Sequence, residues 1–167
     1  TVTGGEAVVQ TEFLVELLKR CKEAGIHTSI ETCSACSWDK IRQTLPYIDE
    51  YLCDVKHTDP VKLRAETGGD AQMLLDNIRK LAENGAKILA RVPMIPGFNT
   101  DEAEVESIGR FIASCKIPRV EILNFHRLGV PKYIKCFAGR LPKEREPLTQ
   151  QELDRRLEIL RSLGLEA

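Results

Sequence analysis

Segments with the pattern of a β-strand alternate with segments with the pattern of an α-helix along almost the whole chain. Short apolar runs bounded by turn residues predict strands at 26–32, 48–55, 86–92 and 120–125. Apolar residues at helical spacing predict helices at 12–24, 38–45, 71–84, 101–115 and 149–163. Repeated β–α units join parallel strands through right-handed crossovers. The sequence therefore predicts an α/β fold of parallel strands with alternating helices.

The number of predicted strands limits the architecture. Residues 1–3 have the pattern of the end of a further strand whose start would precede Thr1. The strands are too few to close an eight-stranded barrel, so the sequence leaves open an open sheet or an arc of a larger or partial barrel. We expect residues 1–167 to form one domain, and to be the later part of a longer protein whose N-terminal strand or strands are missing here.

Composition and charge exclude several functional classes. The chain has 167 residues, 43% of them hydrophobic, which is enough for one domain with a buried core. Its net charge of −1 provides no basic surface for nucleic acid or anionic membrane. No apolar run is long enough to cross a bilayer, and no signal-peptide pattern is visible. We therefore expect a cytoplasmic protein whose six cysteines form no disulfides.

Polar residues recur at one structural place, the C-terminal end of each predicted strand. They are Gly4, Gly5 and Glu6 after residues 1–3, Glu31 and Thr32 at the end of 26–32, Asp54 and Lys56 at the end of 48–55, Arg91 near the end of 86–92, and His126 after 120–125. In a parallel α/β sheet the strand C-termini lie along one edge, and ligands bind there. The pattern predicts that these residues form the rim of a single active site.

Each group also has a structural interpretation. The two glycines before Glu6 allow a ligand to approach the backbone, but they would also suit a plain tight turn. Asp54 and Lys56 lie two apart and share one face of a strand, so they are either a salt bridge or a pair of groups that binds an ammonium and a carboxylate.

Two basic residues, Arg91 and His126, also have two interpretations each. Arg91 lies in an otherwise apolar strand and needs an anionic partner, which is either a ligand or Glu31. The turn-rich segment 93–99 that follows could form a wall of a nucleoside-sized pocket. His126 is either a structural histidine or a ligand contact, and its place beside the other polar groups favours the second.

Cys33 and Cys36 form a Cys-x-x-Cys pair. One such pair does not make a zinc site. A thioredoxin-like role would place it at the start of a helix, which Ser37 and Trp38 could provide. A coincidence within a loop is the interpretation we favour.

The order and spacing of these motifs resemble those of the glycyl-radical-enzyme activating enzymes over almost the whole chain. The matching segments are Thr-Gly-Gly-Glu at 3–6, Glu-Thr-Cys at 31–33, Asp-Val-Lys-His at 54–57, Arg-Val-Pro-Met-Ile-Pro-Gly-Phe-Asn at 91–99, and Phe-His-Arg-Leu-Gly at 125–129. That family belongs to the radical S-adenosylmethionine superfamily. The resemblance implies an arc of a partial (β/α)6, TIM-like barrel.

The resemblance also implies a chemistry and a set of contacts. A [4Fe–4S] cluster and S-adenosylmethionine would generate a glycyl radical on a partner enzyme such as pyruvate formate-lyase, with electrons from a flavodoxin or ferredoxin. Gly4, Gly5 and Glu6 would hold the methionine amino group. Asp54, Lys56 and His126 would contact the methionine or ribose, and Arg91 and Pro93 would line the cofactor site. Glu31, Thr32 and the backbone of Leu52 fall where some relatives bind a monovalent cation, although those relatives have Asp in place of Glu31.

The chain departs from the family in one respect. The Cys-x3-Cys-x2-Cys run that holds the cluster is absent from the sequence, and Cys33 and Cys36 lie in a different loop. We therefore expect the cluster ligands upstream of Thr1, and no catalytic residue or activity in this chain alone. A radical enzyme acting on a small molecule or peptide, and a non-catalytic interaction domain, are the alternatives.

Overall fold

The computed structural model describes residues 1–129, 131, 135–136 and 144–167. Its single sheet contains four parallel strands, in the same order in space as in the sequence. They are β1 (Ser29–Thr32), β2 (Glu50–Asp54), β3 (Ile88–Met94) and β4 (Arg119–Asn124). The prediction of a parallel α/β fold is confirmed. Residues 130, 132–134 and 137–143, which follow β4 in the sequence, lie outside the described residues.

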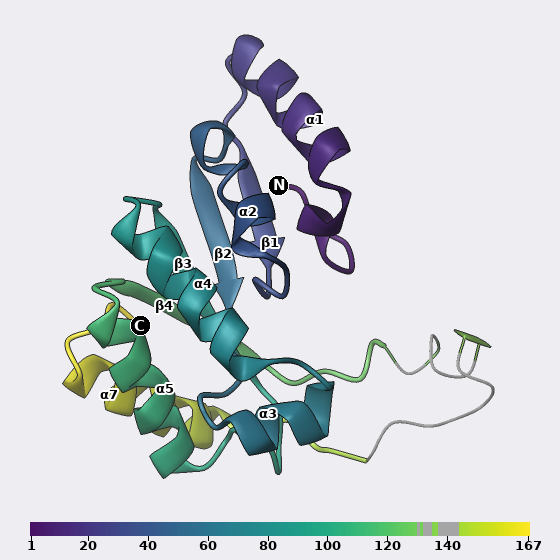
Figure 1. Cartoon of the computed structure of the whole chain (residues 1–167). Helices are drawn as coiled ribbons and strands as arrows, with labels where there is room; N and C mark the ends of the chain where they lie inside the picture. The colour runs from purple at the N-terminus through teal and green to yellow at the C-terminus, as the bar shows by residue number, and fades with distance from the viewer. Residues whose placement is uncertain (130, 132–134, 137–143) are drawn as a thin grey trace.

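Helices separate the strands along the chain, as predicted. They are the 3₁₀ helix η1 (Ala7–Gln10), α1 (Thr11–Glu23), α2 (Trp38–Ile41), the 3₁₀ helix η2 (Leu45–Tyr47), α3 (Pro60–Thr67), α4 (Ala71–Glu83), α5 (Glu102–Ser114) and α7 (Gln150–Ser162). Figure 1 shows the elements following one another from the purple N-terminal edge to the yellow C-terminal end. No helix within the described residues has the length and apolar character that crossing a membrane requires.

Both edges of the sheet are extended by single residues near the chain termini. Val2 forms a parallel bridge to Ile30, with its amide 2.8 Å from the carbonyl oxygen of Ser29. At the opposite edge Glu166 forms a parallel bridge to Arg119. Val2 therefore lies beside β1 in parallel orientation, where the sequence predicts the end of a further strand; that strand stays a prediction.

Among the described residues, helices cover one face of the sheet and leave the other uncovered. Alternate residues of β3, namely Ile88, Ala90, Val92 and Met94, are buried, while the residues between them are half-buried. The buried face joins one core with side chains from α1, α2, α4, α5 and α7. Because side chains alternate along a strand, the other face presents a separate set of residues. This one-sided arrangement fits an arc of a barrel, in which the uncovered face points inward.

Two local predictions were wrong. The helix predicted at 38–45 ends at Ile41, because the amide and the hydroxyl of Thr44 both donate to the Ile41 carbonyl, at 2.9 and 2.7 Å, a spacing of three residues in place of the helical four. The 3₁₀ helix η2 follows and contains Pro46. Helix α3 was missed, although its Asp-Pro start is a known signal: the Asp59 carboxylate accepts hydrogen bonds from the amides of Val61 and Lys62 at 2.8 and 3.0 Å.

Two of the helices begin at well-defined caps. Asp101 is the N-cap of α5. A capping box opens α7: the Thr149 hydroxyl accepts from the Glu152 amide, and the Glu152 carboxylate accepts from the Thr149 amide.

Two adjacent residues of β3 test which face of the sheet is covered. Ile88→Ala should lower the free energy of unfolding by about 2–5 kcal/mol, because it removes a side chain packed against the helices. Leu89→Ala should cost only about 1 kcal/mol, because its side chain is on the uncovered face and already meets water. Urea unfolding of the 167-residue chain measures both. Equal costs would show that both faces are packed.

Candidate functional site

Charged side chains form a continuous row across the uncovered face of the sheet. Glu31 on β1, Asp54 on β2 and Arg91 on β3 lie on this face, since Asp54 pairs in register with Arg91 and Glu31 pairs with Leu52. The Arg91 guanidinium lies 3.0 Å from a Glu31 carboxylate oxygen and 2.9 Å from Asp54 Oδ1. Lys56 Nζ lies 3.0 Å from Asp54 Oδ2 and extends the row.

The row is partly shielded from water, which strengthens its interactions. The Arg91 side chain is 14% exposed and that of Asp54 19%. The Arg91 guanidinium and the Thr3 hydroxyl, 2.9 Å away, hold the pKa of Glu31 below its ordinary value. Burial opposes the charge of Arg91, but its hydrogen bonds to Glu31 and Asp54 outweigh burial and raise its pKa. Of the alternatives for these residues, the structure shows the ion pairs: Arg91 pairs with Glu31 and Asp54, and Asp54 with Lys56. A ligand contact by these groups stays a prediction.

Glu6 joins the N-terminal segment to the end of β1. Its carboxylate accepts hydrogen bonds from the Thr32 hydroxyl at 2.8 and 2.9 Å and from the Cys33 amide at 3.1 Å. It also caps η1 by accepting from the Val8 amide. Gly4 has φ +142°, a conformation that favours glycine, and a Cβ atom there would meet nothing within 4 Å. The Gly-Gly-Glu segment is therefore a turn whose carboxylate is engaged and whose glycine backbone stays accessible.

The remaining predicted residues, Pro93 and His126, lie at the same edge of the sheet but are not part of the ion-pair row. Pro93 is half-buried in β3, two residues beyond Arg91 and on the same face. His126 was expected to end the last strand, but β4 ends at Asn124 and His126 is exposed in the segment beyond it. The structure thus brings together the groups of β1, β2 and β3, and places His126 at the margin.

The residues suggested for a monovalent cation are arranged less favourably. Glu31 and Thr32 are adjacent, so they leave opposite faces of β1. Glu31 faces the Arg91 guanidinium, while the Thr32 hydroxyl donates to Glu6. The backbone of Leu52 pairs in register with Glu31. A cation at this place would compete with a guanidinium, and the site stays a prediction.

A cluster of metal ligands is not part of the described structure. Within residues 1–129, 131, 135–136 and 144–167, no three His, Cys, Asp or Glu side chains are grouped closely enough to hold a metal ion. Binding of a [4Fe–4S] cluster needs several thiolates around one centre. The residues described here do not fit such a cluster.

The Cys33–Cys36 pair has the properties of half-buried thiols. Burial and the nearby Glu6 carboxylate raise the pKa of Cys36 to about 11 and also raise that of Cys33. The Cys33 thiol donates a hydrogen bond to Glu6 at 3.3 Å. Helix α2 begins directly after the pair but contains only four residues. These surroundings suppress the thiolate, whereas a redox-active pair requires it.

Three asparagines that the sequence analysis did not select hold the loops at this edge. Asn77 on α4 donates to the carbonyls of Ser34 and Cys36, and Asn124 at the end of β4 exchanges hydrogen bonds with the backbone of Leu148. Asn99 donates to the carbonyl of Lys56, just after β2, and to that of Pro93, near the end of β3. Of the three, Asn77 could have been selected from the sequence, because it lies on the apolar face of α4 between Leu74 and Ile78. A buried amide there needs hydrogen-bond partners, which are usually backbone groups.

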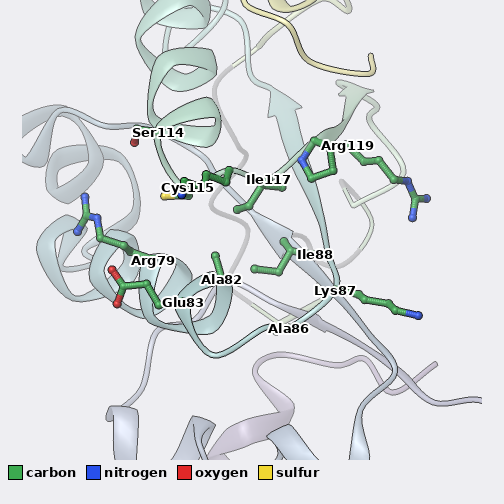
Figure 2. Close-up of a pocket in the computed structure, with 12 residues that line it drawn as sticks. Arg79, Ala82, Glu83, Ala86, Lys87, Ile88, Ser114, Cys115, Ile117 and Arg119 are labelled. Atoms are coloured by element: carbon green, nitrogen blue, oxygen red, sulfur yellow. The ribbon is translucent and has the colours of Figure 1, made fainter.

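A cavity of about 710 Å³ lies at the opposite end of the strands. It is between the C-terminal ends of α4 and α5 and the starts of β3 and β4, and Figure 2 shows Arg79 and Glu83 of α4 on one side and Arg119 on the other. No predicted site residue lines it. Ligands of parallel α/β sheets bind at the strand C-termini, so the charged row, and not this cavity, is the candidate site.

Comparison with known proteins identifies the family. The family model of the radical SAM superfamily matches residues 1–107, which is well over half of the 167 residues. This chain belongs to the radical SAM superfamily. Members of that superfamily use S-adenosylmethionine and a [4Fe–4S] cluster.

The curated homologues are activating enzymes of glycyl radical enzymes. Isethionate sulfite-lyase activating enzyme of Nitratidesulfovibrio vulgaris is 34% identical over 162 residues, which cover 96% of this chain and 52% of that protein. (2S)-3-sulfopropanediol dehydratase activating enzyme of Klebsiella oxytoca is 37% identical over 136 residues, which cover 80% of this chain and 43% of that protein. The chain therefore spans about half the length of these relatives.

A solved structure matches the fold at nearly full length. It is a domain of pyruvate-formate lyase-activating enzyme from Bacteroides vulgatus, with a TM-score of 0.81 and 26% sequence identity. The match covers 99% of this chain and 96% of that one. A radical SAM domain of this extent has thus been crystallised.

Thiol labelling distinguishes a redox-active pair from a structural one. With iodoacetamide at pH 7.5, the exposed Cys136 should react at least about tenfold faster than Cys36, because only the thiolate is nucleophilic and the pKa of Cys36 is about 11. Cys136→Ser should remove the fast phase of labelling, and Cys36→Ser should leave it unchanged. If Cys33 or Cys36 reacts first, the pair has a low-pKa thiol and the redox interpretation returns.

Proposed function

We propose that this chain is the C-terminal part, residues 1–167, of the radical SAM barrel of a glycyl-radical-enzyme activating enzyme. The observation that carries the proposal is the row Glu31–Arg91–Asp54–Lys56 on the uncovered face of the sheet. Its support comes from the relatives, whose names describe activating enzymes and whose sequences match 80% or more of this chain. The protein substrate would be a glycyl radical enzyme, and its identity is not encoded in these residues.

The residues present fit the methionine part of S-adenosylmethionine. That group carries an ammonium and a carboxylate, and the row offers charges of both signs within a partly shielded surface. Lys56 Nζ can donate three hydrogen bonds, and its contact with Asp54 uses one of them. The accessible backbone of Gly4 and Gly5 would accept from the ammonium. Asp54 and Lys56 would orient the zwitterion or the ribose, with His126 at the margin, while Arg91 and Pro93 would line the site.

Arg91 and Glu31 have a different part in this proposal. Because Arg91 already contacts two carboxylates, its main role would be to hold the Asp54 carboxylate in a fixed direction. A preorganised carboxylate binds a cationic group without the cost of ordering its own side chain. Glu31 forms the second ion pair of the Arg91 guanidinium and is the end of the row on β1.

The described residues do not fit a [4Fe–4S] cluster. S-adenosylmethionine and the cluster supply the radical chemistry of the superfamily. The sequence contains no Cys-x3-Cys-x2-Cys run, so we propose that the cluster ligands belong to a part of the protein that precedes Thr1. A flavodoxin or ferredoxin would serve as electron donor, in a cytoplasmic setting.

Radical transfer to the partner tests the proposed activity directly. The full-length protein, reconstituted anaerobically and mixed with S-adenosylmethionine, a reductant and each of a panel of glycyl radical enzymes in turn, should produce the EPR doublet of a glycyl radical with one of them. The Cys33→Ser/Cys36→Ser double variant should produce the same signal, because neither thiol belongs to the proposed cluster site. Absence of the doublet in a cluster-loaded wild type that cleaves S-adenosylmethionine would point to a different substrate.

Calorimetric titration of the full-length protein with S-adenosylmethionine tests the site residues. Lys56→Ala and Asp54→Asn should weaken binding at least about tenfold, since removing one member of a shielded charge pair typically costs more than about 1.4 kcal/mol. His126→Ala should cost less, about 1 kcal/mol if it donates one neutral hydrogen bond.

The matched control is Lys22→Ala. Lys22 forms an ion pair with Asp49 at the other end of the strands, so its loss should change stability and leave affinity unaltered. If all three site variants have lower melting temperatures but unchanged affinity, the row has only a structural role and does not bind the cofactor.

A further inference from the structure

Pro93 breaks the hydrogen-bond ladder between β2 and β3. Strand β3 has a paired neighbour on each side, a position where proline is rare because it lacks an amide hydrogen. The ladder includes the bonds from the Tyr51 amide to Lys87 and from the Val55 amide to Arg91, both 2.8 Å. Bonds of a parallel ladder alternate between the strands, so the next donor would be Pro93, which has none to give. The β2–β3 pairing ends there, while the β3–β4 pairing continues to Met94.

The side chain of Asn99 spans the gap that this break leaves. Its Nδ2 donates to the carbonyl of Lys56 at 2.8 Å and to the carbonyl of Pro93 at 2.7 Å, while its Oδ1 accepts from the Ile95 amide at 2.7 Å. The side chain is fully buried. Both amide hydrogens are used, so one residue satisfies backbone groups of the segment after β2, the end of β3 and the turn beyond it.

The connected segments carry candidate site residues. Lys56, whose backbone Asn99 holds, extends its ammonium group to Asp54 Oδ2. Pro93 lies on the same face as Arg91. Asn77 and Asn124 each hold one loop, whereas Asn99 holds the exits of two neighbouring strands against each other.

We infer that Asn99 is a positioning residue for the S-adenosylmethionine site, and that it fixes the separation between the Lys56 segment and the end of β3. This inference rests on the proposed function. Without the amide, two buried carbonyl groups lose their donor, and the strand exits would separate or admit water. Lys56 would then present its ammonium group from a shifted backbone.

The affinity of the full-length, cluster-loaded protein for S-adenosylmethionine tests the inference. Asn99→Ala removes all three hydrogen bonds. Asn99→Asp keeps the acceptor for Ile95 but has no donor for the two carbonyls when ionised. Asn99→Ser retains one donor and serves as the mildest change if the others fold poorly. Each should weaken binding in the folded fraction, by at least about tenfold for Ala and Asp and by less for Ser.

Thr44→Val is the matched control for lost stability. Thr44 is fully buried, donates to the Ile41 carbonyl at 2.7 Å and contacts the Tyr51 hydroxyl at 2.8 Å. It belongs to the helix-covered side of the sheet, where Tyr51 is buried. Its replacement also removes hydrogen bonds from the interior, but it should leave the affinity within about twofold of wild type.

A double-mutant cycle separates positioning from general destabilisation. If Asn99 acts by placing Lys56, then Asn99→Ala should weaken binding much less in the Lys56→Ala background than in wild type. Amide hydrogen exchange adds a reading that needs no ligand: the Ile95 amide should exchange faster in Asn99→Ala than in Thr44→Val.

The outcomes are distinct. Asn99 variants that bind as tightly as Thr44→Val, or a cycle in which the two losses simply add, would overturn the inference while leaving the proposed function in place. A wild-type protein that holds its cluster but does not bind S-adenosylmethionine would overturn the proposed function, and the inference with it. Loss of affinity in the Asn99 variants together with a non-additive cycle supports both.

Discussion

The guanidinium of Arg91 lies between carboxylates from the two preceding strands, and the polar face of the sheet depends on this contact. An arginine in the middle of an apolar strand is tolerable only where its charge is matched and its donors are used. Glu31 and Asp54 provide that match on one face, so the opposite face of β3 can remain purely apolar and pack against the helices. The same ion pairs fix the direction of Asp54, which brings Lys56 into the row.

The end of the sheet follows from a second constraint, the missing amide hydrogen of Pro93. Where the β2–β3 ladder stops, the buried amide of Asn99 donates to the carbonyls of Lys56 and Pro93 and so connects the segments that leave the two strands. Asn77 and Asn124 do similar work at the exits of β1 and β4. Irregular backbone at a ligand-binding edge is therefore held by side-chain amides in place of ladder bonds, which keeps loops of a binding site in one geometry.

The charged row and the amide contacts serve the proposed activity in complementary ways. The row offers charges of both signs to a zwitterionic cofactor, and the amides keep the segments that carry those charges from moving apart. A radical-generating site benefits from such order, because a reactive group must meet its intended partner before water or a neighbouring side chain.

The sequence by itself determined the parallel α/β order, the edge of the sheet where polar groups gather, and the family resemblance, because strand and helix periods and strand-end positions are local properties. It also predicted that Asp54 and Lys56 share a face, and it left open whether Arg91 pairs with Glu31 or with a ligand. Only the tertiary structure decided between an open sheet and a barrel-like arc, since that depends on which face the helices cover. It alone placed Asn99 between two strand exits and engaged Glu6 with Thr32, because contacts between residues far apart in sequence follow from the register of neighbouring strands.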